Sequence, residues 1–357
     1  MPADIASEPA AGAAAPGRPA GPPGQSAGSR AVGLGRRLLT LREGSVIVIT
    51  IVVAAYFAAT TDAFLTWENF KTLLPYFAPF AILAAGEVFL MINGEIDLSI
   101  GAVYLFAPFL FYEIDTSWGL PLMPSLILAL VACMVVGGIN GFFTAVIGIN
   151  SFITTLGMLL ALEGFTLIIS NAQPVATPGT SVIEDKSTFA SIFGGGTYSE
   201  LIWALAVVIV LQLVLSYTRW GIYTVAVGGN RLGAGEAGIK VRLVVIRNFI
   251  LCSLCAGLVG VLEAVRTTSV QPDPSGANSV LFDGITAAVI GGTLLAGGSG
   301  TVVGGLIGAL LLGILNDGLI IKGVNADYLS FYLGIAIIIA MAANTYVGRV
   351  RTGSGSG

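Results

Sequence analysis

The sequence predicts an all-α integral membrane protein with about ten transmembrane helices. Of its 357 residues, 55% are hydrophobic and only 10% are charged, whereas a soluble globular domain carries about 25% charged residues. Apolar runs long enough to cross about 30 Å of hydrocarbon recur along the chain. The 48 glycines fit such a bundle, because small residues let neighbouring helix backbones approach closely.

Three segments are expected along the chain. Residues 1–42 are rich in Ala, Gly, Pro and Ser and are predicted to form a disordered cytoplasmic tail. Residues 43–348 form the predicted transmembrane domain, and residues 349–357, which end in TGSGSG, a flexible C-terminal tail or linker. The predicted spans are 45–62, 69–92, 98–113, 122–147, 152–170, 199–217, 244–265, 281–296, 300–321 and 327–347.

The third and eighth spans are short and adjoin glycine-rich breaks. Short or interrupted spans are where transport proteins place non-helical backbone along a pathway. Two short helices that simply tilt little in a thin section of membrane explain the same pattern.

The distribution of charge predicts the orientation. With the N-terminal tail in the cytoplasm, ten spans place most of the 16 basic residues on the cytoplasmic side. The exceptions are Lys71, Lys186, Arg266 and Lys322. This asymmetry satisfies the positive-inside rule. It predicts a multi-pass membrane protein with both termini cytoplasmic.

Several classes of chemistry are excluded or disfavoured. The chain has no histidine, which removes every histidine-dependent catalytic arrangement and the commonest metal ligand. G-x-x-x-x-G-K-[ST] is absent, so the chain itself is not expected to hydrolyse ATP. Cys133, Cys252 and Cys255 lie in apolar runs and are interpreted as ordinary buried cysteines. No catalytic residue, metal or cofactor is predicted.

The segment INGEIDLSIG, residues 92–101, separates the second and third spans. Glu95 and Asp97 have no basic residue near them in the sequence, and two such acids suit coordination of a cation or receipt of a proton. Helix capping is the favoured interpretation. In it, Asp97 or Ser99 begins the third helix and Gly94 ends the second.

The loop at residues 219–243 is the longest cytoplasmic connection in this orientation and the only one that is strongly charged. The sequence GGN at 228–230 is predicted to interrupt regular structure. The sequence RLGAGEAGI after it is predicted to form a short helix along the membrane face. Such a helix suits docking into a groove on a partner protein. A solvated turn with inside-positive residues is the alternative. Farther along, Gly300, Gly304 and Gly308 recur at every fourth position, which predicts a smooth helix face for close packing.

Four segments together resemble the permease family of ATP-binding-cassette importers for ribose, xylose, arabinose and similar sugars, within the branched-chain-amino-acid/monosaccharide permease superfamily. They are GEIDLSIG (94–101), NGFFTAVIGINSFITTLG (140–157), AVGGNRLGAGEAGI (226–239) and ITAAVIGGTLLAGGSGTV (285–302). The matches run in order over about residues 65–345. Glu95 departs from the family pattern, which has glycine there, and Ser151 replaces the family's proline.

The resemblance implies a permease of the plasma (inner) membrane of a prokaryote that pairs with a second copy or a related permease. Cytoplasmic ATP-binding subunits and an extracytoplasmic solute-binding protein are the other implied partners, and nucleic acid is not one. It also implies that a coupling helix seats on the ATP-binding subunit, carried by Gly228, Gly229, Asn230, Glu236, Ala237, Gly238 and Ile239. An uncharged sugar needs hydroxyl and amide groups with apolar or aromatic walls. The pathway candidates, on or just beyond the fifth span, are Phe152, Thr154, Thr155, Asn171 and Gln173.

Asp97 precedes Asn140 by the same number of residues as Asp273 precedes Asn316. This repeated spacing is weak support for an inverted repeat of spans two to five and seven to ten. A secondary transporter that acts without an ATPase remains the rival function. The acids available to it for ion coupling are Glu87, Glu163, Glu263 and Asp317. A membrane scaffold that moves no solute is the third possibility.

Overall fold

The computed structural model describes residues 43–179, 188–325, 328–335, 337–339 and 341–342, and the expected tails at 1–42 and 349–357 lie outside this part of the chain. Its helices are α2 (Gly44–Thr60), α3 (Trp67–Ile92), α4 (Ile100–Thr116), α5 (Leu122–Phe142), α6 (Ser151–Ile169), α7 (Thr188–Ile192), α8 (Ser199–Tyr217), α9 (Arg219–Gly229), α10 (Arg231–Glu236), α11 (Val241–Thr267), α12 (Pro274–Ile290) and α13 (Val302–Ile321). A π-helical turn, η1 (Phe143–Ile147), continues α5. Two short antiparallel strands, β1 (Val175–Ala176) and β2 (Ser269–Val270), pair with Val175 opposite Val270.

Six helices in the described residues are long and apolar enough to cross a membrane: α3, α5 with η1, α6, α8, α11 and α13. They confirm an all-α membrane protein. Helices α2, α4 and α12 have 17 residues each, which corresponds to about 25 Å and is slightly less than the hydrocarbon thickness. The tenth predicted span, 327–347, lies partly outside the described residues. The count of ten and the inverted repeat therefore stay predictions.

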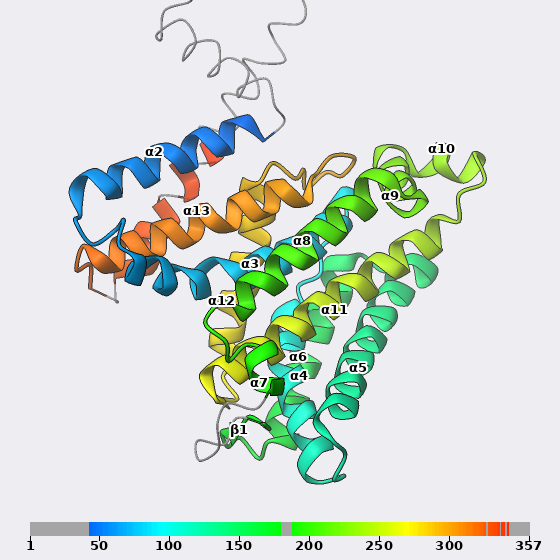
Figure 1. Ribbon diagram of the computed structural model, residues 1–357. Coiled ribbons are helices and arrows are strands. Elements are labelled where there is room, and N and C mark those ends of the chain that lie inside the picture. The colour runs from blue at the N-terminus through cyan, green and yellow to red at the C-terminus, as the bar shows by residue number, and fades with distance from the viewer. Residues whose placement is uncertain (1–42, 180–187, 326–327, 336, 340, 343–357) are drawn as a thin grey trace, which may run out of the picture. The chain divides into compact units, whose positions relative to one another are not determined.

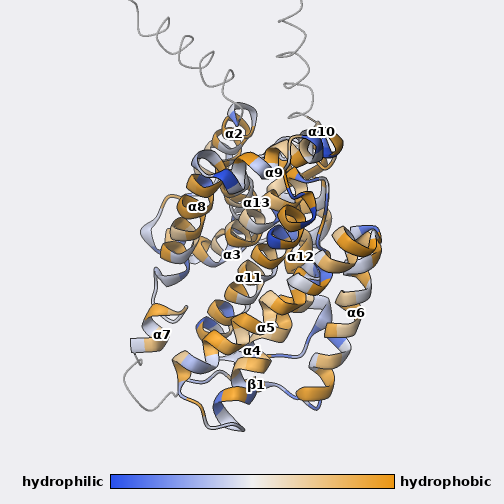
Figure 2. Cartoon of the chain, turned by 90° about the vertical axis from the view of Figure 1, so that its right-hand side faces the viewer, coloured by the Kyte–Doolittle hydropathy of each residue, from blue (hydrophilic) through white to orange (hydrophobic). Residues whose placement is uncertain are grey.

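Helices α3 and α11 form the centre of the bundle (Figure 1). In their most apolar windows 83% and 78% of the residues are buried, whereas the fraction for α6 is 22%. Helix α11 packs against α3, α4 and α5, and α12 and α13 also pack against α3. The outer helices α5 and α6 are coloured largely as hydrophobic in Figure 2. Apolar surface of this kind suits contact with lipid tails.

The eighth predicted span is shifted along the chain. It was expected at 281–296, but α12 begins at Pro274 and ends at Ile290. The side chain of Asp273 accepts a hydrogen bond from the Ser275 backbone N–H at 3.0 Å, and proline follows Asp273 at the first helical position. This cap starts the helix early. Gly292, with φ +90°, lies just beyond its end, so most of residues 291–301 form a loop.

The predicted glycine face of α13 consists of two glycines instead of three. A Cβ at Gly304 would lie 2.2 Å from the carbonyl oxygen of Gly291, and one at Gly308 would lie 2.1 Å from that of Ala287. These glycines therefore allow α12 and α13 to pack closely. Gly300 lies in the preceding loop, because α13 starts only at Val302.

Candidate functional site

The connection between α3 and α4 is a tightly held break in the helix. Gly94 has φ +74°, a conformation in which glycine carries no steric penalty. Asp97 is fully buried, and its Oδ1 accepts hydrogen bonds from the Ser99 backbone N–H at 2.8 Å and from Ser99 Oγ at 2.6 Å. Asp97 thus orders the start of α4, as the capping interpretation expects. Ser99 is the N-cap residue but makes no side-chain cap bond.

Helices α5 and α6 each form hydrogen bonds with the residues of this break. Asn140 of α5 donates to Ser99 Oγ at 2.9 Å and to Asp97 Oδ1 at 3.4 Å. The Leu98 backbone N–H donates to Thr155 Oγ1 of α6 at 3.0 Å. The spacing of Asp97 and Asn140 therefore corresponds to a contact. Asp273 and Asn316 share no hydrogen bond among the described residues, and Asp273 caps α12 instead.

Glu95 has a basic partner that is distant in the sequence. Arg231, the first residue of α10, forms an ion pair with the Glu95 carboxylate. Nη2 of Arg231 also donates to the carbonyl oxygen of Asn93 at 3.1 Å. The Glu95 side chain is only 9% exposed and that of Arg231 is 49% exposed. No basic residue lies near Glu95 in the sequence, but the fold brings Arg231 to it from 136 residues away.

The short helix expected after GGN is present as α10. Asn230 starts it, since Asn230 Oδ1 accepts from the Gly233 backbone N–H at 2.9 Å. Gly238, with φ +82°, follows its end. Gly228 lies so close to α3 that a Cβ would be 1.7 Å from the Ile92 carbonyl oxygen. The other predicted coupling residues lie on the surface or at its margin: Gly229, Glu236, Ala237 and Gly238 are exposed, and Ile239 is partly buried.

A buried polar network joins α9 and α11 to the end of α3. Asn248 of α11 donates to Asn93 Oδ1 at 2.6 Å, to Thr224 Oγ1 at 3.2 Å and to the Phe89 carbonyl at 3.2 Å. Asn248 Oδ1 accepts from Trp220 Nε1 at 2.6 Å. This network was not predicted from the sequence. The feature that could have indicated it is the single asparagine, Asn248, inside the apolar run 244–265.

The loop between α12 and α13 also contacts the end of α3. The Gly298 backbone N–H donates to the Ile92 carbonyl oxygen at 2.7 Å, and a Cβ at Gly228 would lie 2.8 Å from that nitrogen. Three of the segments that carry the family resemblance, 94–101, 226–239 and 285–302, therefore meet beside α10. Figures 1 and 2 both show α10 at the end of the bundle opposite β1.

The five pathway candidates do not converge on one site. Thr155 is buried, and its hydroxyl both accepts from Leu98 and donates to the Ser151 carbonyl at 2.8 Å. Phe152 is exposed near the start of α6. Asn171 and Gln173 are exposed just beyond its other end. Thr154 lies in the first turn of α6 and is partly buried. Their role in a pathway stays a prediction.

The acids that the rival function needs lie on four different helices. Each has its own partner: Glu87 accepts from Cys252 Sγ, Glu163 from Asn278 Nδ2, and Asp317 from Asn69 Nδ2, and Glu263 pairs with Arg266. Among the described residues no group of three or more acids or cysteines is placed to hold a metal ion. The arrangement does not favour a shared ion site.

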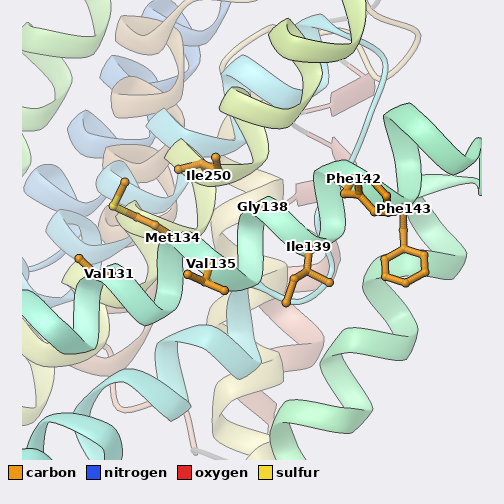
Figure 3. A pocket seen from close by; sticks show the side chains of 8 residues that line it. All are labelled: Val131, Met134, Val135, Gly138, Ile139, Phe142, Phe143 and Ile250. Atoms are coloured by element: carbon orange, nitrogen blue, oxygen red, sulfur yellow. The ribbon is translucent and has the colours of Figure 1, made fainter.

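A shallow cavity of about 530 Å³, open to the surroundings, lies on the outer side of α5 and η1 (Figure 3). Its lining is apolar and includes Met134, Phe142 and Phe143, with Ile250 from α11. Side chains of this kind offer no hydrogen bonds to a hydroxylated solute. The cavity suits lipid or another apolar surface.

Residues 69–341 match the family described as branched-chain amino acid transport system / permease component. The chain belongs to this permease family. It is 35% identical over 317 residues to the xylose/arabinose import permease protein of Sulfolobus acidocaldarius, covering 86% of each chain. It is 32% identical over 319 residues to the ribose import permease protein of Escherichia coli K12, covering 86% of this chain and 96% of that one.

The D-allose transport system permease protein of E. coli K12 is 29% identical over 311 residues, covering 86% of this chain and 93% of that one. No solved structure matches. The permease is thus a multi-pass membrane protein and a transport subunit rather than an enzyme.

Proposed function

We propose that this permease is the transmembrane subunit of an ATP-binding-cassette importer that moves a monosaccharide or a related polyhydroxylated solute into the cytoplasm. Relatives that match most of their length are named as import permeases for xylose and arabinose and for ribose. A further relative is named as a permease of a D-allose transport system. Similarity over nearly the whole chain supports the same class of solute here.

The observation that carries the proposal is the short helix α10 at one end of the bundle. Its Leu232 side chain is 75% exposed, and Glu236 near its end is exposed too. An exposed apolar residue on a short helix suits a groove on a partner protein. At the same time Arg231 and Gly228 hold the segment against the break between α3 and α4. Movement of a docked partner would therefore reach the membrane-embedded part.

The proposal includes the partners of such an importer. Two cytoplasmic ATP-binding subunits bind α10 and its neighbours, at positions 228–230 and 236–239. An extracytoplasmic binding protein delivers the solute, and a second copy of the chain or a related permease completes the pathway in the lipid bilayer. Ten spans with both termini in the cytoplasm of a prokaryote place the basic loop that contains α10 inside, as the positive-inside rule requires. We therefore propose this topology for the permease.

Cross-linking from α10 tests this arrangement. In membranes that contain the permease and its ATP-binding subunits, Glu236→Cys carrying a thiol-reactive photo-cross-linker should form an adduct with an ATP-binding subunit. The three natural cysteines are buried, so we expect little background labelling. Asn171→Cys, exposed just beyond α6, is the matched control and should give no such adduct. An adduct from Asn171→Cys, or none from Glu236→Cys, would contradict the proposal.

A further inference from the structure

We infer that the ion pair between Arg231 and Glu95 is a strut that transmits the position of α10 to the break between α3 and α4. The inference rests on the proposed function, because it assigns a role in coupling to two positioning residues that do not touch the solute. Arg231 lies on the helix proposed to dock on the ATPase, and Glu95 is a buried residue of the segment 93–99. The pair joins the two directly.

The burial of Glu95 makes the pair a specific link. The Glu95 side chain is 9% exposed, so its carboxylate has little water to replace a lost partner. Arg231, whose side chain is half exposed, contacts both that carboxylate and the Asn93 carbonyl, and its planar fork of donors suits two such acceptors at once. Removing Arg231 leaves the mostly buried Glu95 carboxylate without its partner, which is unfavourable.

Both ends of the strut are fixed to stiff elements. On one side Asn230 caps α10, and the close approach of Gly228 to Ile92 prevents the start of the helix from sliding. On the other side Asn93 is held by Asn248, and Asp97, two residues after Glu95, is bonded to Ser99. A displacement of α10 is therefore passed on to residues 93–99 instead of being absorbed by a loose loop.

The pair lies beside an uncharged contact between α9 and the end of α3. That contact includes the hydrogen bond from Asn93 Nδ2 to the Thr224 carbonyl at 2.7 Å and the edge-on packing of Phe89 against Trp220. The ion pair adds an attraction between opposite charges next to this contact. Its removal should therefore weaken coupling without removing the docking surface on α10.

A charge swap in the reconstituted complex tests the strut. The single variants Glu95→Arg and Arg231→Glu should lower the ratio of solute transported to ATP hydrolysed by about tenfold, within the usual range of coupling between sites. The double swap Glu95→Arg/Arg231→Glu should return the ratio to within about twofold of wild type, because it restores the attraction. Arg242→Glu, an exposed residue with no ion pair among the described residues, controls for the change in surface charge and should transport normally.

The neutral variant Glu95→Gln/Arg231→Gln covers the case in which the single variants fail to insert. It removes the attraction without leaving a lone buried charge, and it should lose coupling as the single variants do. A normal ratio in this variant, or a double swap no better than the single changes, would overturn the inference.

Hydrogen exchange in detergent separates this inference from the proposed function, because it needs no solute. Amides in residues 93–99 should exchange about tenfold faster in Arg231→Glu and return to wild-type rates in the double swap. Unchanged exchange in Arg231→Glu refutes the strut even if the complex transports solute. Wild-type protein without ATP-dependent uptake, but with the expected exchange pattern, would refute the importer while leaving the mechanical link in place.

Discussion

Replacing Gly228 with alanine is expected to reduce ATP-driven uptake by about tenfold or more. The added Cβ would lie 1.7 Å from the Ile92 carbonyl oxygen and 2.8 Å from the Gly298 nitrogen. Both are backbone atoms, so α9 has to move away from α3. Overpacking of this kind costs about 1–3 kcal/mol, and 1.4 kcal/mol already corresponds to a tenfold change in an equilibrium constant. Uptake by reconstituted complexes measures the effect.

Gly164→Ala is the control for this prediction. Gly164 also lies in a helix, α6, but a Cβ there has no atom within 4 Å. The control variant should insert normally and keep its uptake to within about twofold of wild type. Equal uptake by the Gly228→Ala and Gly164→Ala variants would show that the close approach of α9 to α3 is not required for transport.

Replacing Asn248 with leucine is expected to destabilise the permease and to abolish most uptake. The change leaves Trp220 Nε1 and Asn93 Oδ1 without their bonds to Asn248, which measure 2.6 Å each. A buried polar group without a partner costs about 1–3 kcal/mol. The substitution also removes the hydrogen bonds from α11 to Asn93 and Phe89 of the α3 end and to Thr224 of α9. Thermal unfolding in detergent should show a lower Tm than wild type.

Cys255→Ala is the control in the same helix. Cys255 is buried as Asn248 is, but its thiol makes no hydrogen bond among the described residues. We expect a small decrease in Tm and normal uptake. If the two variants unfold at the same temperature, the network around Asn248 contributes no more than ordinary packing does.

The sequence was informative where a structural feature depends on neighbouring residues. Apolar runs located α3, α5, α6, α8, α11 and α13 to within a few residues, since hydrocarbon thickness sets their length. The GGN break and the short helix after it were also predictable, because Asn230 and Gly238 act through local backbone geometry. The start of α12 was missed because Asp273 and Pro274 lie in a polar stretch before the apolar run.

The contacts that assemble the candidate site were not predictable in this way. Arg231 and Glu95 are 136 residues apart, and Asn248 and Asn93 are 155 apart. Each of these residues alone has an ordinary explanation, as a surface charge or a polar residue in a helix. Only the packing of α9 and α11 against the end of α3 brings them together. The pathway candidates on and beyond α6 do not converge on one site, so their role in a pathway stays a prediction.

Uptake into proteoliposomes tests the central claim most directly. Vesicles would contain the permease, its ATP-binding subunits and its binding protein, with labelled ribose or xylose outside. Our account predicts accumulation that requires ATP hydrolysis and the ATP-binding subunits, and that persists when sodium and proton gradients are collapsed. Accumulation driven by an ion gradient in vesicles that hold the permease alone would contradict it, and so would the absence of flux under either condition.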